Sequence, residues 1–140
     1  MTRIDFHSNV SDRIGYACRL TRKARHTNAQ VVLLVSNADL ETLDDALWRF
    51  SVEDFLPHVL ASSPLAGHTP IILADSDAID LPHHQVLINL SGATPAHFAR
   101  FERMFEIISD DEEQKTMARE RYLFYKQRGY ALMHFDADKS

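Results

Sequence analysis

The chain has 140 residues, a formal net charge of -5, and 45% hydrophobic with 25% charged residues, as in an ordinary globular protein. A negative net charge disfavours sequence-independent binding to DNA, and the single cysteine, Cys18, has no partner for an internal disulfide. The N-terminus lacks an apolar signal core and the longest aliphatic run, 31–35, is too short to span a bilayer, so we expect a cytoplasmic protein without membrane contact.

The first half of the chain alternates predicted strands and helices. Polar and apolar residues alternate over 3–7, which predicts a strand, and Ser11 is the expected N-cap of a helix over 12–25. A strand is predicted over 30–35, because the uninterrupted apolar run 31–35 is typical of a strand that is covered on both faces. Either Ser36 or Asn37 can cap the next helix, predicted over 40–50. Residues 71–73 and 86–90 are two further predicted strands.

The second half continues the alternation. Thr94 and Pro95 predict the start of a helix that reaches about Met104, because threonine caps helices and proline fits the first helical position. A short strand is expected over 106–108. The acidic residues 110–113 favour the start of a last helix, about 112–127, which Gly129 ends. This order indicates an α/β fold: one domain over 1–140, built as a three-layer sandwich with a mainly parallel sheet.

The sequence carries no recognisable catalytic pattern. Its four glycines form no phosphate-binding loop or dinucleotide fingerprint, and Ser62-Ser63 lacks the glycines of a nucleophile elbow. The pair His83-His84, with aspartates at 75, 77 and 80, matches no zinc pattern, so a solvated loop is favoured over a metal site. Cys18 lies among apolar residues, as a buried structural thiol does. We therefore expect a protein that is not an enzyme and has no cofactor or metal.

An aromatic cluster follows the helix predicted over 40–50. On a helical wheel Leu47 faces inward, whereas Trp48 points about 100° away from it and tends outward. Together with Phe55, Leu56 and Pro57, Trp48 forms either a second core layer or a partner-binding surface, because exposed aromatic residues are typical of interface hot spots.

Five of the fifteen cations are concentrated between positions 115 and 128. On a helical wheel one stripe holds Lys115, Arg119, Tyr122 and Lys126, all within about 40° of Lys115. Arg121 and Arg128 point in other directions. A solvated helix face is one interpretation. A site for a small acidic ligand is the other, because arginine grips a carboxylate through two N–H donors and an aromatic ring can wall an apolar pocket.

These segments resemble a known family. The motifs Leu43-Asp44-Asp45-Ala46-Leu47-Trp48, Phe55-Leu56-Pro57-His58 and Ala118-Arg119-Glu120-Arg121-Tyr122 are similar, in this order, to those of the chi subunit of the bacterial DNA polymerase III holoenzyme. The resemblance covers essentially the whole chain. It implies a clamp-loader accessory protein with a nucleotide-binding-like α/β fold that lacks a phosphate loop.

The resemblance also implies two binding surfaces. One would hold the acidic C-terminal tail of single-stranded DNA-binding protein, which ends in phenylalanine. The resemblance places Lys115, Arg119, Tyr122 and Ile108 there, and the basic stripe adds Lys126. The other would hold the psi subunit of the clamp loader, through Trp48, Phe55, Pro57 and His58. Contact with DNA would then be mostly indirect.

Two further points bear on these expectations. The segment 130–135 keeps the aromatic and aliphatic character of the family but not the polar residues of the pocket's far wall, where His134 stands. The alternative function is direct binding of single-stranded nucleic acid by the basic helix, with Tyr122 as a stacking platform.

Overall fold

The computed structural model describes residues 1–50, 56–78 and 80–139. Within these ranges the strands are β1 (Arg3–Val10), β2 (Val31–Leu34), β3 (His58–Leu60), β4 (Ile71–Ala74), β5 (Val86–Asn89), β6 (Arg103–Ser109) and β7 (Ala131–Asp136). The α-helices are α1 (Arg13–His26), α2 (Leu40–Phe50) and α3 (Glu112–Gln127). Single 3-10 turns occupy 37–39, 66–68, 98–100 and 137–139.

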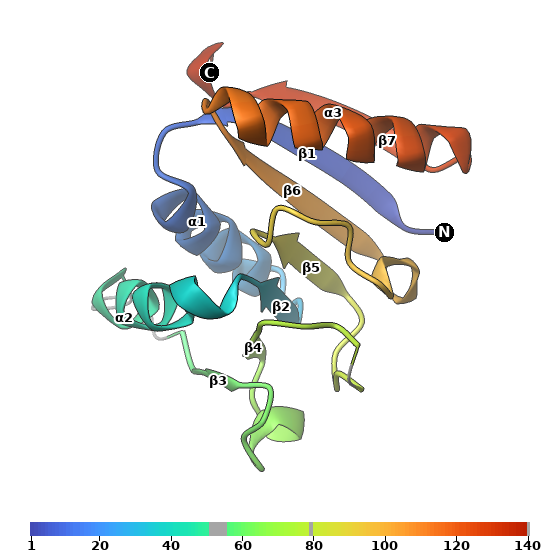
Figure 1. Ribbon diagram of the computed structural model, residues 1–140. Helices are drawn as coiled ribbons and strands as arrows, with labels where there is room; N and C mark the ends of the chain where they lie inside the picture. Colours follow the sequence, from blue (N-terminus) through green and yellow to red (C-terminus); the bar gives the residue numbers. More distant parts are fainter. Residues whose placement is uncertain (51–55, 79, 140) are drawn as a thin grey trace.

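All seven strands form one sheet in the order β3-β4-β2-β5-β6-β1-β7, and every neighbouring pair is parallel. The first strand therefore lies between the last two, with Arg3 opposite both Arg103 and Ala131. Figure 1 shows α3 running along the β1–β7 end of the sheet, while α2 and β3 lie at the other end. The α/β sandwich expected from the sequence is confirmed, and the sheet is wholly parallel.

The two faces of the sheet bury separate apolar clusters. On one face, Val31 and Leu33 pack with Cys18 of α1 and Leu47 of α2. On the other, Val32 and Leu34 belong to a cluster that includes residues of α3. Because successive strand residues point to opposite faces, the run 31–34 must be apolar throughout, which is the pattern that identified this strand.

The helix predicted from Thr94 to Met104 is wrong. This segment forms a single 3-10 turn over 98–100, and β6 already begins at Arg103. The Asp77 carboxylate accepts hydrogen bonds from the backbone N–H groups of Ala96 (2.9 Å) and His97 (2.6 Å). That contact from a distant loop fixes the backbone here, so the apolar side chains of Phe98 and Phe101 are buried without an α-helix.

Other boundaries differ less. Asp12, and not Ser11, caps α1, because its side chain accepts from the Gly15 N–H at 3.0 Å. Both edge strands, β3 and β7, escaped the sequence analysis. None of the helices in the described ranges combines the length and apolar character needed to cross a bilayer.

Candidate functional site

An apolar hollow beside α3 has a volume of about 370 Å³. We call it the α3 cavity and define it by the residues that line it: Phe6, Ser8, Asn9, Ile108, Lys115, Ala118, Arg119, Tyr122, His134 and Asp136. These residues come from α3 and from the three strands beneath it, β6, β1 and β7. Four of the five residues expected at a tail-binding site are therefore brought together in one place.

The position of α3 explains which of its side chains reach the cavity. Ala118, Arg121 and Tyr125 are buried against the sheet, so the neighbouring stripe of the helix faces the β1–β7 end. The Tyr122 ring lies with its edge on the Phe6 ring, their centroids 5.1 Å apart. This contact holds Tyr122 as a wall of the cavity.

Two cations and an apolar floor give the α3 cavity its chemical character. Phe6, Ile108 and Ala118 are buried, and they form apolar surface within reach of a ligand. Arg119 is exposed and makes no hydrogen bond or ion pair within the described residues. Lys115 lies 3.9 Å from Glu112, a loose ion pair. The cavity can therefore accept an apolar group while Arg119 grips a carboxylate.

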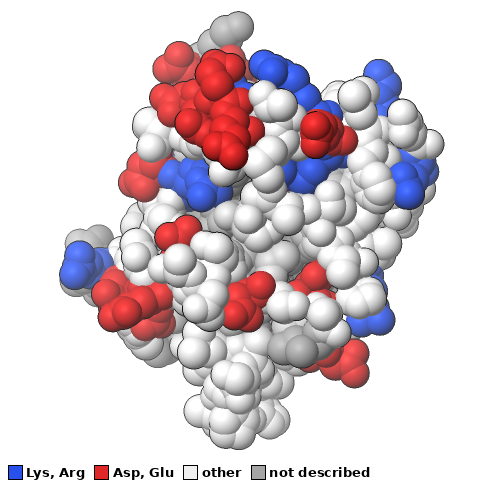
Figure 2. Space-filling model, in the orientation of Figure 1, with Lys and Arg blue, Asp and Glu red and all other residues white. Residues whose placement is uncertain are grey.

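Lys126 does not line the cavity. It lies on the same stripe as Lys115, but about 16 Å further along the helix axis. Figure 2 shows other basic side chains along α3 and a dense acidic group over its N-terminal end. The acidic run 110–113 supplies part of that group, so negative charge stands beside one end of the cavity.

The far wall of the cavity is polar, contrary to the expectation that residues 130–135 lack polar groups there, and it includes His134 together with Ser8, Asn9 and Asp136. His134 Nε2 lies 2.7 Å from the Ser8 hydroxyl, and the Asn9 amide donates to Asp136 at 3.1 Å. Both contacts join β1 to β7. An early indication of β7 was available, because Gly129 ends α3 and residues 130–135 are largely apolar, a sequence typical of a helix followed by a strand.

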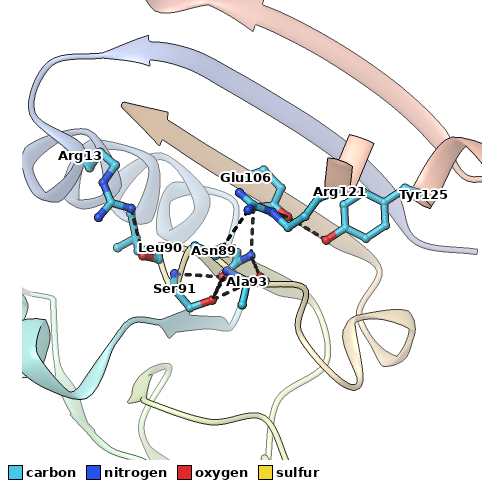
Figure 3. Close-up of polar contacts among 9 residues, drawn as sticks. Arg13, Asn89, Leu90, Ser91, Ala93, Glu106, Arg121 and Tyr125 are labelled. Carbon is cyan, nitrogen blue, oxygen red and sulfur yellow. Dashed lines mark hydrogen bonds and ion pairs between the residues drawn. The ribbon is translucent and has the colours of Figure 1, made fainter. Parts of the chain in front are cut away.

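A buried polar network fixes α3 on the sheet (Figure 3). Arg121 Nε donates to Glu106 Oε2 at 3.1 Å, and its Nη1 donates to the Gly92 carbonyl at 2.9 Å. Tyr125 and Asn89 also donate to the Glu106 carboxylate, at 2.7 and 2.9 Å. Arg121 is thus a structural anchor, whereas its neighbours Arg119 and Tyr122 face the cavity.

The electrostatics of the network follow from its burial. Burial raises the pKa of the Glu106 carboxyl, while the Arg121 guanidinium and the donors from Tyr125 and Asn89 oppose that rise. Burial and the adjacent Glu106 raise the pKa of Tyr125, so its hydroxyl keeps its proton and donates. Every group around Glu106 is a donor, an arrangement that suits an ionised carboxylate.

The aromatic cluster on α2 lies at the opposite end of the sheet. Trp48 is 51% exposed, and its ring centroid lies 4.3 Å from that of His58. His58 is buried, with one ring nitrogen 2.8 Å from the Leu56 carbonyl oxygen and the other 3.0 Å from Asp44 Oδ1. Pro57 is half-buried, and Phe55 lies outside the described residues. We call Trp48, Pro57 and His58 the Trp48 surface; within it, Trp48 is the exposed group and His58 supports its ring.

The histidines and aspartates near position 80 have structural contacts. His83 Nε2 lies 2.5 Å from the Thr69 carbonyl oxygen, Asp77 binds two backbone N–H groups, and Asp75 accepts from Asn37. In the part of the chain that the structure describes, no group of three or more potential ligands is placed to hold a metal ion.

Comparison with known proteins identifies the family. The family model for the DNA polymerase III chi subunit, HolC, matches residues 1–133. The DNA polymerase III subunit chi of Pseudomonas aeruginosa is 33% identical over 137 residues, covering 94% of each chain. The subunits chi of Haemophilus influenzae and Escherichia coli are 28% and 30% identical, over 83% and 64% of this chain and 81% and 61% of their own. The chain belongs to the DNA polymerase III chi subunit family.

Proposed function

We propose that this chain is a non-catalytic adaptor that binds the acidic C-terminal tail of single-stranded DNA-binding protein in the α3 cavity. Membership of the chi family makes the chain a DNA replication subunit. The observation that carries the proposal is the pairing of Arg119 and Lys115 with the apolar walls Phe6, Ile108 and Tyr122. A tail that ends in phenylalanine offers a ring for those walls and carboxylates for the two cations.

The second part of the proposal concerns the Trp48 surface, which would bind a clamp-loader partner, the psi subunit. Its support is the exposed indole of Trp48, since exposed aromatic side chains often anchor interfaces. The two surfaces lie at opposite ends of the sheet, so both partners can be held at once. Such tethering in the cytoplasm would raise the local concentration of polymerase on coated template.

The tail site is tested with a synthetic acidic peptide that ends in phenylalanine, measured by fluorescence anisotropy. Arg119→Ala should weaken binding of the peptide by about thirtyfold, or about 2 kcal/mol, because it removes a charged anchor. Arg128→Ala is the matched control: it removes the same charge from the end of the same helix, where Arg128 stacks on Phe124 at 3.6 Å and does not line the cavity. Equal affinities for all three proteins would refute the assignment.

A peptide with an amidated C-terminus provides a further arm. If Arg119 and Lys115 hold the terminal carboxylate, the amidated peptide should bind the wild-type protein weakly. Its affinity should be about that of the peptide with a free C-terminal carboxylate for the Arg119→Ala protein. Trp48→Ala tests the second surface: co-purification with the clamp-loader partner should be lost, while peptide binding stays unchanged. Loss of both activities in a folded Trp48→Ala protein would contradict two separate surfaces.

The alternative function, direct binding of single-stranded nucleic acid, makes a different prediction. If the basic stripe neutralised several phosphates, the affinity of the protein for bare single-stranded DNA would fall steeply with salt concentration. The edge contact of Tyr122 with Phe6 disfavours this function, because it engages the ring that would stack on bases. Binding to bare oligonucleotide that falls steeply with salt and requires Arg119 would favour it.

A further inference from the structure

A second cavity lies on the opposite face of the same two strands. Successive strand residues point to opposite faces, so β1 and β7 present Phe6 and His134 to the α3 cavity and His7 and Phe135 to the other side. There a hollow of about 330 Å³ lies beside the C-terminal half of α1. We call it the α1 cavity. The two hollows are of similar size.

The walls of the α1 cavity are largely apolar. Leu20 and Ala24 line it from α1, Val86 and Phe105 from the neighbouring strands, and Phe135 from the edge strand. α1 borders the hollow on one side, and Phe135 on the edge strand is 41% exposed. Parallel sheets ordinarily bury both faces, so this end of the sheet leaves aromatic surface without a cover.

The charges at the α1 cavity favour an anion. Lys23 and Arg103 line it, and none of the described residues that line it carries a carboxylate. Arg103 donates to the buried Asp5 Oδ2 through Nε at 3.2 Å and Nη2 at 2.5 Å, and its guanidinium lies 4.5 Å from the Phe105 centroid. Lys23 is exposed and has no ion pair within the described residues. One positive charge thus stands uncompensated beside the apolar walls.

His7 adds an unsatisfied polar atom to this wall. The residue is 8% exposed, its Nδ1 is hydrogen-bonded to the Tyr16 hydroxyl, and its Nε2 has no hydrogen-bond partner among the described residues. Burial lowers the pKa of His7, so the ring is neutral at pH 7. When the Tyr16 hydroxyl donates to Nδ1, the ring hydrogen sits on Nε2, and that buried donor lacks an acceptor.

We propose that the α1 cavity is a second socket for the C-terminal aromatic residue of an acidic peptide. The carboxylate would be held by Lys23, and the ring would pack against Phe105 and against Phe135, which stacks on the buried His7 ring. The inference rests on the proposed function, since it assigns the same ligand class to a second site. A partner presenting more than one tail could then occupy both faces of the β1–β7 edge, and each contact would reinforce the other.

The second socket is the weaker of the two, because the charge of Arg103 is already paired with Asp5. It is therefore tested in the Arg119→Ala protein, where the α3 cavity no longer binds tightly. The acidic peptide ending in phenylalanine is titrated at high concentration and followed by NMR. We expect shifts at His7, Lys23 and Phe135, with a fitted affinity that falls by on the order of tenfold when Lys23→Glu is added. Arg49→Glu, an exposed charge reversal on α2 outside both cavities, is the matched control.

The outcomes separate this inference from the proposed function. Absence of shifts around His7, or shifts that Lys23→Glu leaves unchanged, overturns the second socket even if Arg119→Ala abolishes tight binding as proposed. Conversely, tight binding that survives Arg119→Ala but is lost on Lys23→Glu supports the α1 cavity and overturns the assignment of the α3 cavity. Phe135→Ala is a second variant at an exposed position, and it should also weaken the shifts at His7 without unfolding the chain.

Discussion

Replacing Arg121 by methionine should destabilise the fold severely. Glu106 is fully buried and Arg121 is only 6% exposed, so Arg121→Met leaves an uncompensated carboxylate in the core. Breaking a buried pair in this way costs about 3–5 kcal/mol, and the lost hydrogen bond to the Gly92 carbonyl adds about 1 kcal/mol. With an m-value of about 2 kcal/mol per molar, the midpoint of urea unfolding should fall by about 2–3 M.

The double variant Arg121→Met/Glu106→Leu is the matched control. It removes both charges, so most of the lost stability should return, because a buried pair is often no better than apolar groups of similar volume. A loss below about 1 kcal/mol for Arg121→Met alone, or no recovery in the double variant, would refute the reasoning.

The pH dependence of the single variant gives a further check. Burial raises the pKa of Glu106 above its ordinary 4.5, and removing Arg121 takes away the charge that opposes this rise. Because the pKa of Glu106 is higher in the folded protein than in the unfolded chain, protonation of Glu106 favours the folded state. That stabilisation is fully present below the unfolded-state pKa of Glu106 and is lost as the pH rises through its folded-state pKa. The deficit of Arg121→Met should therefore shrink as the pH falls toward 4.5.

Three further predictions concern single residues. Cys18 is buried and its pKa is raised to about 11, so a thiol reagent at pH 8 should label it only as fast as the chain unfolds; rapid labelling of the native protein would contradict this. The pKa of His7 is lowered below 6.5 in the folded protein, so as the pH falls His7 is protonated in the unfolded chain before it is protonated in the folded one. The wild-type protein should therefore lose more stability between pH 7.5 and 5.5 than the His7→Gln variant. Equal losses in the two proteins would exclude this effect of His7. Gly129→Ala should cost about 1 kcal/mol in urea unfolding because Gly129 has φ +82°, and an unchanged midpoint would argue against strain there.

The central strands and α3 could be predicted because their signals are local. The apolar run at 31–35 has one physical explanation, burial on both faces, and Gly129 ends α3 by a capping motif in which the Tyr130 N–H donates to the Tyr125 carbonyl. The helix expected after Thr94 failed because Phe98, Phe101 and Phe105 imitate helical spacing. The contact that decides their conformation, from Asp77, is not local.

The candidate site was predictable only in part, for a geometric reason. A helical wheel gives direction around an axis but not position along it, which is why Lys126 fell on the right stripe and still missed the cavity. The wheel also separated Arg121 from Arg119, but only the partner Glu106 shows that Arg121 is buried. The polar wall formed by Ser8 and His134 depends on pairing of the first strand with the last, which no local pattern reveals.

The position of β1 between β6 and β7 has a consequence for synthesis of the chain. Its neighbours are made last, because Arg3 pairs with Arg103 and Ala131. Until the ribosome has released β6, the apolar side chains of β1, Ile4 and Phe6, have no strand beside them, and the second neighbour, β7, follows only after α3. Both cavities at this edge can therefore form only after translation of β7, and nascent chains that stall before β6 present an unpaired apolar strand, a target for chaperones.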